Sequence, residues 1–433
     1  MSQKLKVTSA VEDEAQSYWR ATAVPFEPPP AELPQQADVV VVGAGFTGTS
    51  AARVLAERGA AVAVLDAQSI GWGASTRNGG MMIVGLKQGP EVLLKLYGAE
   101  LGRRMFEASL EANRYVEELI TRENLDCEYR RHGHFTAAFK SRDYDALERE
   151  AEFLESHFAH TTKLVPRKSI AGELDSPLYH GGVVDESSAG LHPAKYLAGL
   201  ARLASRAGAS LHPYTAVLTV EHAARGFSVR TSRGQIRARD VLIATNGYTG
   251  DTFADFQRRV IPMGSYIVVT ERLDPALAER IIPKGRMIID TKHVLYYCRR
   301  TADDRLLFGG RASFAPTTVG RSHEILRGAI AKVYPELTGV RIEYAWKGNV
   351  AFTFDLLPHL GRHSDGTHYA MGFCGHGVAM GSYLGARIGA MIASDEAPAP
   401  PFASLPFETR FFYRGKPWFL PLVGWWYRLL DAL

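Results

Sequence analysis

Apolar residues near the start of the chain gather in short runs, separated by a glycine turn and an amphipathic stretch. The runs predict a strand over residues 39–42, a helix over 49–58 and a second strand over 61–66, which is the order of a βαβ unit. A later apolar strand, predicted over 241–244, returns the chain to this unit. We therefore expect an α/β domain here.

Residues 259–350 follow a shorter period, in which apolar and polar positions alternate. Runs such as SYIVVTE, HVLYYCR and RLLFGG are typical of strands, and they favour a mostly antiparallel sheet that faces the first domain. Residues 369–393 predict a further strand, glycine turn and helix. The two domains are thus expected to be interleaved along the chain.

The composition is that of an ordinary soluble globular protein, with 46% hydrophobic and 22% charged residues among 433. The net charge is +4 and no Lys/Arg block stands out, so a nucleic-acid partner is not expected. The three cysteines, Cys127, Cys298 and Cys374, are far apart and predict neither a disulfide framework nor a metal site. No signal peptide and no run of about 18 apolar residues is present, so we expect a cytoplasmic protein without a transmembrane segment.

A glycine-rich turn joins the first strand to the first helix. The first glycine permits the tight turn, the second lets backbone N–H groups approach a pyrophosphate, and the third lets helix and strand pack closely. Asp66 ends the second strand, 18 residues after the last glycine, where it can accept hydrogen bonds from an adenosine ribose. Strand, turn, helix and acid together predict a dinucleotide site at the positive end of the helix. The turn is Gly43-Ala44-Gly45-Phe46-Thr47-Gly48.

A second glycine-rich segment, GWGASTRNGG, occupies residues 71–80. A nicotinamide dehydrogenase has no evident need for it, whereas a flavin deep in the protein needs small residues where the backbone passes its ring. A flexible surface loop is the alternative, but Trp72 and the pair Met81-Met82 are unusual in such a loop. The segment therefore favours FAD as the dinucleotide.

These motifs resemble a known family, the FAD-dependent D-amino-acid-oxidase-like group that includes glycine oxidase, sarcosine oxidase and γ-glutamylputrescine oxidoreductase. The resemblance covers nearly the whole chain, and it extends to VLIATNGYTG at 241–250, TFDLLPHLGR at 353–362 and GFCGHGVAMG at 372–381. GWGASTRNGG, SYWRATA near the N-terminus and FFYRGKPWFLP near the C-terminus are most similar to the γ-glutamylputrescine oxidoreductase branch. The implied fold is α/β, with a Rossmann-like FAD-binding domain and an interleaved substrate domain built on a mostly antiparallel β-sheet plus helices.

The expected organisation combines the pattern with this resemblance. The proline cluster over 25–34 predicts an extended arm. The aromatic tail either lies on a membrane surface or docks on the body of the protein, and docking is favoured. The expected segments are an N-terminal arm over 1–36, a discontinuous FAD-binding domain over 37–100, 181–258 and 351–395, a substrate domain over 101–180 and 259–350, and the tail over 396–433.

The resemblance also implies roles for single residues. Val217 is expected to meet the adenine ring, and the segment 244–246 to close over the pyrophosphate. Gly375-His376-Gly377 precedes a helix, so its N–H groups can face flavin N1 and the C2 carbonyl, where reduced flavin carries negative charge. A purely structural role for His376 stays open. The full set expected to hold a non-covalent FAD is Gly43, Ala44, Gly45, Phe46, Thr47, Gly48, Asp66, Ala67, Gly73, Ala74, Ser75, Arg77, Asn78, Gly79, Gly80, Met81, Val217, Ala244, Thr245, Asn246, Gly348, Gly375, His376, Gly377, Val378 and Ala379.

The implied reaction moves a hydride from the carbon beside a neutral amine nitrogen to flavin N5, and water hydrolyses the imine to an aldehyde or oxo acid plus an amine. The protein would position the C–H bond and select the deprotonated amine. With O2 as acceptor the enzyme would be an oxidase that forms H2O2, and with another acceptor a dehydrogenase. A nicotinamide dehydrogenase and a non-catalytic flavin protein are the rival hypotheses, and the oligomeric state is open.

Three positions depart from the family pattern. Gly348 stands where sarcosine oxidase has its covalent flavin cysteine, Val350 where glycine oxidase has a carboxylate-binding arginine, and Ala379 where sarcosine oxidase has a carboxylate-binding lysine. By a looser alignment, the lysine that assists O2 reduction falls near Leu307. The departures imply a non-covalent FAD and a substrate other than a simple α-amino acid.

Substrate contacts must then come from other residues. Strand alternation puts Tyr296 and Tyr297 on opposite faces, so at most one of them should meet the ligand. A pocket-facing Arg77 or Arg299 would favour a carboxylate substrate such as an N-substituted glycine or iminodiacetate. Without one, a diamine conjugate such as γ-glutamylputrescine fits better. The candidates for substrate contact or catalysis are His376, Tyr297, Arg77, Tyr266, Arg299 and Trp346, with Met81 beside them.

Overall fold

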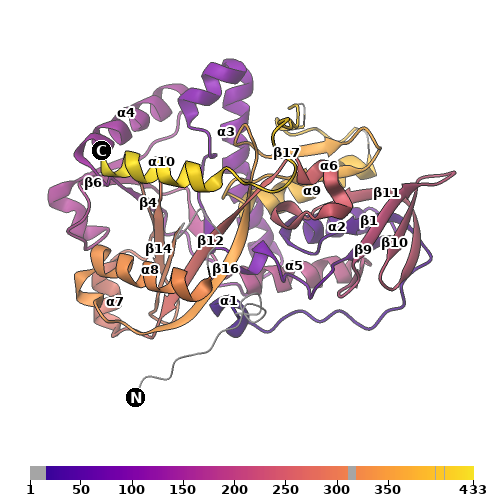
Figure 1. Ribbon diagram of the computed structural model, residues 1–433, viewed down its shortest axis with the longest axis horizontal. Coiled ribbons are helices and arrows are strands. Elements are labelled where there is room, and N and C mark those ends of the chain that lie inside the picture. Colours follow the sequence, from indigo (N-terminus) through magenta and orange to yellow (C-terminus); the bar gives the residue numbers. More distant parts are fainter. Residues whose placement is uncertain (1–15, 311–317, 395, 404) are drawn as a thin grey trace.

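The computed structural model of the protein describes residues 16–310, 318–394, 396–403 and 405–433. Two eight-stranded sheets lie at opposite ends of the longest axis, with helices packed around them (Figure 1). The α/β class with a Rossmann-like domain, predicted from the sequence, is confirmed.

The first sheet is built around the predicted βαβ unit. Strand β1 (Gln36–Val42) lies between β2 (Val62–Leu65) and β11 (Gly234–Ile243), and both pairs are parallel. Helix α2 (Phe46–Glu57) connects β1 to β2 and begins earlier than predicted, directly at the glycine turn. The other strands of this sheet are β8 (Ser210–His212), β9 (Val217–His222), β10 (Phe227–Thr231), β17 (His359–Arg362) and β18 (His368–Met371).

The continuous valine run of β1 is explained by burial on both faces. Val39 and Val41 point into a core that helices build, whereas Val40 and Val42 point into a second core with the β9–β10 hairpin. Continuous apolar strands are typical of parallel sheets with both faces covered. The helices that contribute to the first core are α2, α3 (Pro90–Arg122), α5 (Pro193–Arg206) and α9 (Ala379–Ala393).

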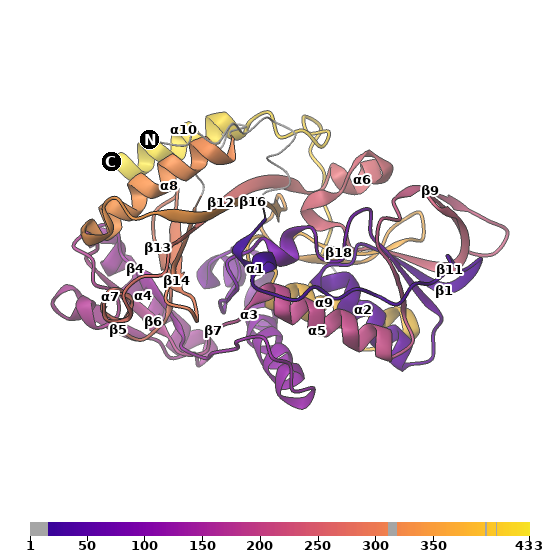
Figure 2. The same ribbon diagram turned by 90° about the horizontal axis from the view of Figure 1, so that it is seen from below.

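The second sheet is antiparallel except for one pair, β13 with β4. Its strands in spatial order are β16 (Ile342–Phe352), β12 (Ile261–Thr270), β15 (Leu306–Gly310), β14 (Tyr296–Arg300), β13 (Met287–Asp290), β4 (His134–Ala137), β6 (Gly181–Asp185) and β5 (Lys163–Pro166). Helices α4 (Ser141–Phe158), α7 (Pro275–Ile281), α8 (Val319–Val333) and α10 (Leu420–Ala432) accompany this sheet (Figure 2).

Short elements complete the described chain. These short elements are helices α1 (Tyr18–Ala21) and α6 (Ala254–Gln257), the two-stranded pair β3 (Met81–Met82) and β7 (Ala189–Gly190), and the 3-10 turns Ala74–Thr76, Arg167–Gly172, Asn246–Tyr248, Asp251–Phe253 and Pro335–Leu337. Within the described ranges, no helix of the protein is both long and apolar enough to cross a membrane.

The structure differs from the expected segments at three places. Strand β6 pairs with β4 and β5 in the second sheet, although the expected FAD-binding segment starts at residue 181. Helix α3 crosses the expected boundary at residue 100 and packs largely in the core of the first unit. The N-terminal arm is not wholly extended, because α1 buries Tyr18 and Trp19 against the second sheet.

Candidate functional site

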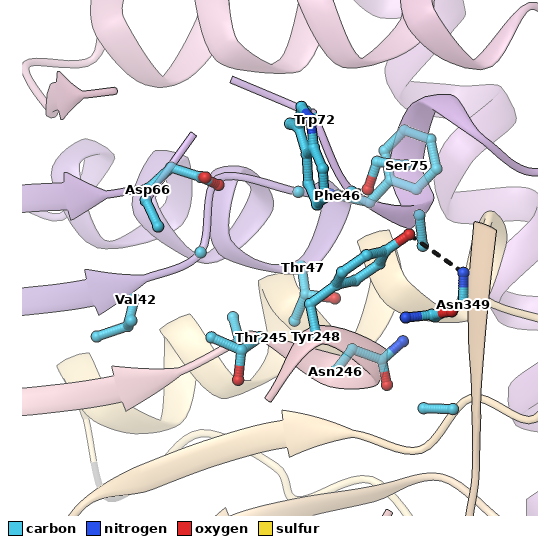
Figure 3. A pocket seen from close by; sticks show the side chains of 18 of the residues that line it. Val42, Phe46, Thr47, Asp66, Trp72, Ser75, Thr245, Asn246, Tyr248 and Asn349 are labelled. Atoms are coloured by element: carbon cyan, nitrogen blue, oxygen red, sulfur yellow. Dashed lines mark hydrogen bonds between the residues drawn. The ribbon is translucent and has the colours of Figure 1, made fainter. Parts of the chain in front are cut away.

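A cavity of about 560 Å³ runs along the carboxyl ends of β1, β2 and β11. Open α/β sheets bind ligands in such a crevice, where neighbouring parallel strands diverge. The glycine turn forms one wall, and the segment after β11 forms the opposite wall (Figure 3). The cavity size lies within the range typical of cofactor sites.

The glycine turn adopts a conformation that side chains would block. Gly43 has φ of +106°, which residues other than glycine rarely adopt. A Cβ on Gly45 would lie 2.8 Å from the Ser75 hydroxyl, and a Cβ on Gly48 would overlap the carbonyl oxygen of Gly43. The tight turn predicted at Gly43 and the helix packing predicted at Gly48 thus match their geometry, and Gly45 leaves room for the Ser75 hydroxyl.

Asp66 is held by backbone groups while its carboxylate lines the cavity. Its Oδ2 accepts the Ala44 N–H at 2.8 Å and its Oδ1 accepts the Gln68 N–H at 2.9 Å. Burial raises the pKa of Asp66, and the two N–H donors counteract that rise. The remaining lone pairs of the carboxylate are available to ribose hydroxyls.

The opposite wall is made by a 3-10 turn after β11. Asn246 has φ of 45°, and its side-chain oxygen accepts the Gly372 N–H at 2.9 Å. The Tyr248 hydroxyl accepts the backbone N–H of Asn349 at 3.1 Å, which ties this turn to β16 (Figure 3). The second sheet therefore helps to close the dinucleotide cavity.

A second pocket, of about 250 Å³, adjoins the first and shares several lining residues with it, among them Ala74, Asn78, Asn349 and Gly375. Most of its wall is apolar. The polar exceptions include the hydroxyl pair of Ser265 and Tyr297, whose oxygens are 2.9 Å apart. Other residues of the wall are Met81, Ile83, Lys87, Met263, Ile289, Leu295, Gly348, Val350, Phe352 and His376.

His376 lies partly buried in the wall of this second pocket as a neutral imidazole. Burial, reinforced by the nearby Lys87, lowers the pKa of His376 to about 4. Its Nδ1 is buried and has no hydrogen-bond partner among the residues that the structure describes. Buried polar atoms normally have a hydrogen-bond partner. This unpartnered atom is therefore consistent with a group bound in the passage, by which we mean the space where the two pockets meet.

Cys374 also lines the passage but is not a reactive thiol. Its Sγ–H donates to the Gly372 carbonyl at 3.1 Å, and burial raises its pKa to about 11. The thiolate, not the thiol, forms covalent bonds readily. At Gly348 an added Cβ would lie 3.0 Å from the Cβ of Arg77, so this position is also crowded. These observations favour a non-covalent FAD.

The residues present fit FAD along both pockets. Val217 and Leu218 line one end of the first cavity, where they would hold the adenine ring. Asp66 would then bind the ribose, and the glycine turn would bind the phosphates. The passage between the pockets is then the place for the flavin ring. Among the predicted FAD residues, Ala44, Gly48, Gly80 and Ala379 do not line either pocket and instead support the residues that do. The predicted residues that do line one are Gly43, Gly45, Phe46, Thr47, Asp66, Ala67, Gly73, Ala74, Ser75, Arg77, Asn78, Gly79, Met81, Val217, Ala244, Thr245, Asn246, Gly348, Gly375, His376, Gly377 and Val378.

The candidates for substrate contact divide into two groups. Tyr297, Arg77 and His376 line the second pocket, and Tyr296 points to the other face of β14, as alternation predicts. Arg77 donates its Nε–H to the Trp72 carbonyl and an Nη1–H to the Lys347 carbonyl, so these donors are engaged by backbone.

Tyr266, Arg299 and Trp346 do not line the pocket. Tyr266 is buried in the core of the second sheet, because Ser265 takes the pocket-facing side of β12. Arg299 donates to the carbonyls of Gly80 and Leu191, and the Trp346 indole donates to the Arg77 carbonyl. All three expected ligand contacts are therefore corrected to supporting positions behind the site.

The lining residues that were not predicted include Lys87, Tyr248, Ser265 and Asn349. Tyr248 belongs to the quoted motif VLIATNGYTG, so its place beside Asn246 was a usable signal. Ser265 adjoins Tyr266, but alternation does not say which face meets the pocket. Lys87 follows the second glycine segment without any motif of its own.

Comparisons with known proteins agree with this geometry. The family described as FAD dependent oxidoreductase matches residues 38–391. γ-Glutamylputrescine oxidoreductase of Escherichia coli (strain K12) is 34% identical over 370 residues, which cover 85% of this chain and 86% of that protein. The probable oxidoreductase OrdL of Rhizobium meliloti (strain 1021) is 31% identical over 424 residues, 95% of this chain and 97% of that protein.

Among solved structures, glycine oxidase from Geobacillus kaustophilus superposes with a TM-score of 0.72 at 21% identity, covering 87% of this chain and 99% of that one. The region that the family matches, residues 38–391, contains the glycine turn, Asp66 and the passage between the pockets. The chain therefore belongs to the FAD dependent oxidoreductase family.

Proposed function

We propose that the protein oxidises the carbon–nitrogen bond of a secondary amine or N-substituted amino acid, of γ-glutamylputrescine-, sarcosine- or iminodiacetate-like type. The observation that carries this proposal is the second pocket, an apolar chamber that joins the flavin passage and contains few polar groups. The similarity to γ-glutamylputrescine oxidoreductase supports an amine donor. When bound, FAD supplies the hydride acceptor and leaves an imine for water to hydrolyse to an aldehyde or oxo acid plus an amine.

The apolar wall acts on the protonation state of the substrate. Met81, Met263 and Phe352 give the chamber an apolar wall, and a low dielectric disfavours an ammonium ion. An amine therefore enters or reacts in its neutral form, which is the form that can give up a hydride. His376 stays neutral beside it, so it adds no charge.

The hydroxyls of Ser265 and Tyr297 orient the substrate. The two hydroxyls are 2.9 Å apart and between them offer both donors and acceptors. Gly309 makes room for this arrangement, because a Cβ there would overlap the Tyr297 ring. A fixed hydroxyl pair holds the amine so that its C–H bond faces the passage.

Lys87 favours substrates that carry a carboxylate. It lines the second pocket, and its charge helps to lower the pKa of His376. The two carboxylate-binding positions of the family are Val350 and Ala379 here, and neither can bind an anion. A carboxylate held by Lys87 would be bound by a residue other than the two of the family pattern, which suits an amino-acid conjugate of an amine better than a simple α-amino acid.

The electron acceptor is O2, with H2O2 as product, or another oxidant that would make the protein an amine dehydrogenase. Leu307, where the loose alignment places the family's lysine, is fully buried in an apolar cluster. A non-catalytic flavin protein is the remaining alternative.

The test is anaerobic reduction of the purified holoprotein by a panel of amines. We expect γ-glutamylputrescine, sarcosine or iminodiacetate to bleach the visible flavin absorption, and peroxide assay after admitting O2 to identify the acceptor. If none of the amines or N-substituted amino acids bleaches a flavin that dithionite does reduce, the proposed activity is wrong and the non-catalytic alternative stands.

A further inference from the structure

The second glycine-rich segment is braced from behind by side-chain donors. Four of its backbone carbonyls, within residues 76–80, each accept a hydrogen bond from a residue distant in the sequence. The bonds are Ser17 Oγ–H to Thr76 O at 2.8 Å, Trp346 Nε1–H to Arg77 O at 3.0 Å, Trp19 Nε1–H to Asn78 O at 2.7 Å, and Arg299 Nη1–H to Gly80 O at 2.7 Å.

Two of these donors precede the region that matches the family. Ser17 and Trp19 lie in the N-terminal arm, ahead of residue 38 where the family match begins. Trp19 is 1% exposed, and the Arg299 guanidinium lies 5.7 Å from its ring centroid. Burying an indole N–H without an acceptor is costly, so these donors fix the carbonyls that they meet.

Peptide geometry links the braced carbonyls to the pocket. In a planar trans peptide the C=O of one residue and the N–H of the next point in opposite directions. Holding the carbonyls of Arg77 and Asn78 toward the two indoles therefore turns the N–H groups of Asn78 and Gly79 the other way. Both of these residues line the second pocket. Within the described chain, neither N–H has a hydrogen-bond acceptor.

We propose that Trp19 and Trp346 are positioning residues, which hold two peptide planes so that Asn78 N–H and Gly79 N–H donate into the flavin passage. Preorganised N–H donors stabilise negative charge that gathers on a bound group. The two indoles thus raise the affinity for FAD and its reduction potential without touching it. This inference rests on the FAD cofactor and is independent of which amine is oxidised.

The variants Trp19→Phe and Trp346→Phe remove one donor each and keep a ring in place. We expect a several-fold rise in the Kd of the apoprotein for FAD and a more negative midpoint potential for the bound flavin. Trp418→Phe is the control, because Trp418 also donates its indole N–H to a carbonyl, but to that of Phe412 in the C-terminal tail and not to one of residues 76–80. Ser17→Ala is a second control, because Ser17 bonds the Thr76 carbonyl and the N–H of that peptide, on Arg77, donates to the Ala74 carbonyl. The FAD affinity and the potential should therefore stay unchanged in this variant.

A lowered melting temperature with unchanged FAD affinity and unchanged potential in both tryptophan variants would overturn the proposal. Such a result would mean that the indoles stabilise the fold without setting the donors. If one of the two tryptophan variants fails to fold, the other decides the question by the same two measurements.

The C-terminal helix α10 carries a second, independent feature. Its inner face docks on the protein, where Leu420 and Gly424 are buried and the Asp431 carboxylate accepts the N–H groups of His293 and Val294. Docking of the tail, favoured from the sequence, therefore occurs. The outer face is an apolar stripe at spacings of three, four, seven and eleven residues, formed by Leu422, Trp425, Trp426, Leu429 and Leu433.

The tail that carries this stripe also exposes aromatic and positively charged side chains. Trp425 and Trp418 are 65% and 63% exposed. Arg414, Lys416 and Arg428 are also exposed, whereas Asp431 is turned inward onto His293. Monomeric soluble proteins rarely expose an apolar patch of this kind without a partner.

We infer that this face of α10 lies on an anionic lipid surface. Indole rings and the stems of Lys and Arg suit the boundary between headgroups and acyl chains, and exposed cations attract anionic lipids. A second copy of the chain fits less well, because a two-fold contact on this face would bring two surfaces with exposed cations together.

The holoprotein should sediment with phosphatidylglycerol-containing vesicles and less with pure phosphatidylcholine vesicles, with binding weakened by salt. Trp425→Ser together with Leu429→Ser should abolish binding, whereas the matched pair Leu96→Ser and Tyr214→Ser, also exposed, should not. No binding to either vesicle would overturn the inference. A concentration-dependent dimer that the α10 variant abolishes would replace it with self-association.

Discussion

His376 shows how burial sets the charge of a single residue in the candidate site. Its folded pKa of about 4 lies below the ordinary value for histidine, so between those values the unfolded chain binds a proton that the folded chain does not. Stability is therefore complete above the ordinary histidine pKa and falls as the pH drops toward 4.

The variant His376→Asn should flatten this part of the pH profile. We expect wild-type protein to lose roughly 1–3 kcal/mol more than the variant between neutral pH and the folded pKa. Melting temperatures of both proteins across this range measure the difference. Parallel curves would contradict the expectation, because His134 and His192, whose pKa values burial also lowers, are common to both proteins.

Lys87 offers a test of substrate recognition at the same scale. Lys87→Gln should lower kcat/KM by about tenfold for an amine substrate that carries a carboxylate, since a hydrogen bond to a charged group is lost. An analogue without the carboxylate should be unaffected. The matched control is Lys95→Gln, because Lys95 is also exposed but does not line the pocket. An equal loss for both substrates would contradict a role for Lys87 in carboxylate binding.

At this scale the sequence predicts the dinucleotide residues far better than the substrate residues. The glycine turn and Asp66 are local: each role follows from neighbours along the chain. The face of β12 that meets the pocket does not follow from neighbouring residues. Alternation puts Ser265 and Tyr266 on opposite faces but does not say which face meets the ligand. Arg299 and Trp346 appeared suited to a ligand, yet their donors serve backbone carbonyls that the sequence does not place beside them.

At the scale of elements, helices α2 and α9 cross at very close range. Gly381, Gly385 and Gly389 lie on the contacting side of α9, and a Cβ on Gly389 would lie 2.8 Å from the Ala51 carbonyl oxygen. A Cβ on Gly385 would overlap the Thr47 carbonyl oxygen. The close crossing brings the N-termini of both helices to the FAD cavity, where their dipoles favour negative charge.

Gly385→Ala should push the two helices apart. We expect a loss of about 1–3 kcal/mol in stability, as for other overpacked sites, and weaker FAD binding. Gly328→Ala in helix α8 is the matched control, because that glycine has no neighbour within 4 Å. The control should gain about 0.5–1 kcal/mol from helix propensity. Urea unfolding of both variants gives the comparison, and equal stability of the two would contradict the packing argument.

The N-terminal arm marks the limit of local prediction for elements. Its proline cluster explains the extended stretch after α1. Helix α1 itself has only four residues, too few to show a periodic pattern. Its stability comes from contacts with distant residues, such as the bond from the Tyr18 hydroxyl to Asp303. Such long-range contacts leave no signal in the neighbouring sequence.

At the scale of the whole molecule, the FAD site draws on both sheets. The first pocket lies mainly on the βαβ sheet, and the second is closed by β12, β14 and β16 of the other sheet. The order of segments along the chain predicted this interleaving. The sequence pattern did not predict the placement of β6 and α3, because strand pairing and helix packing are decided by partners that lie far away in the sequence.

FAD should therefore stabilise the two sheets as one unit. A ligand that binds only the folded state adds about 4 kcal/mol at a thousandfold excess over its Kd, so removal of FAD should lower the melting temperature clearly. ADP offers a sharp comparison, because it can fill only the first pocket. The two ligands are compared at the same ratio of ligand concentration to Kd. FAD should give a single, sharper unfolding transition, whereas ADP should stabilise the βαβ sheet and leave the second sheet to unfold at a lower temperature. Calorimetry of the apoprotein with each ligand distinguishes the two, and identical single transitions would show that the second pocket does not couple the sheets through the cofactor.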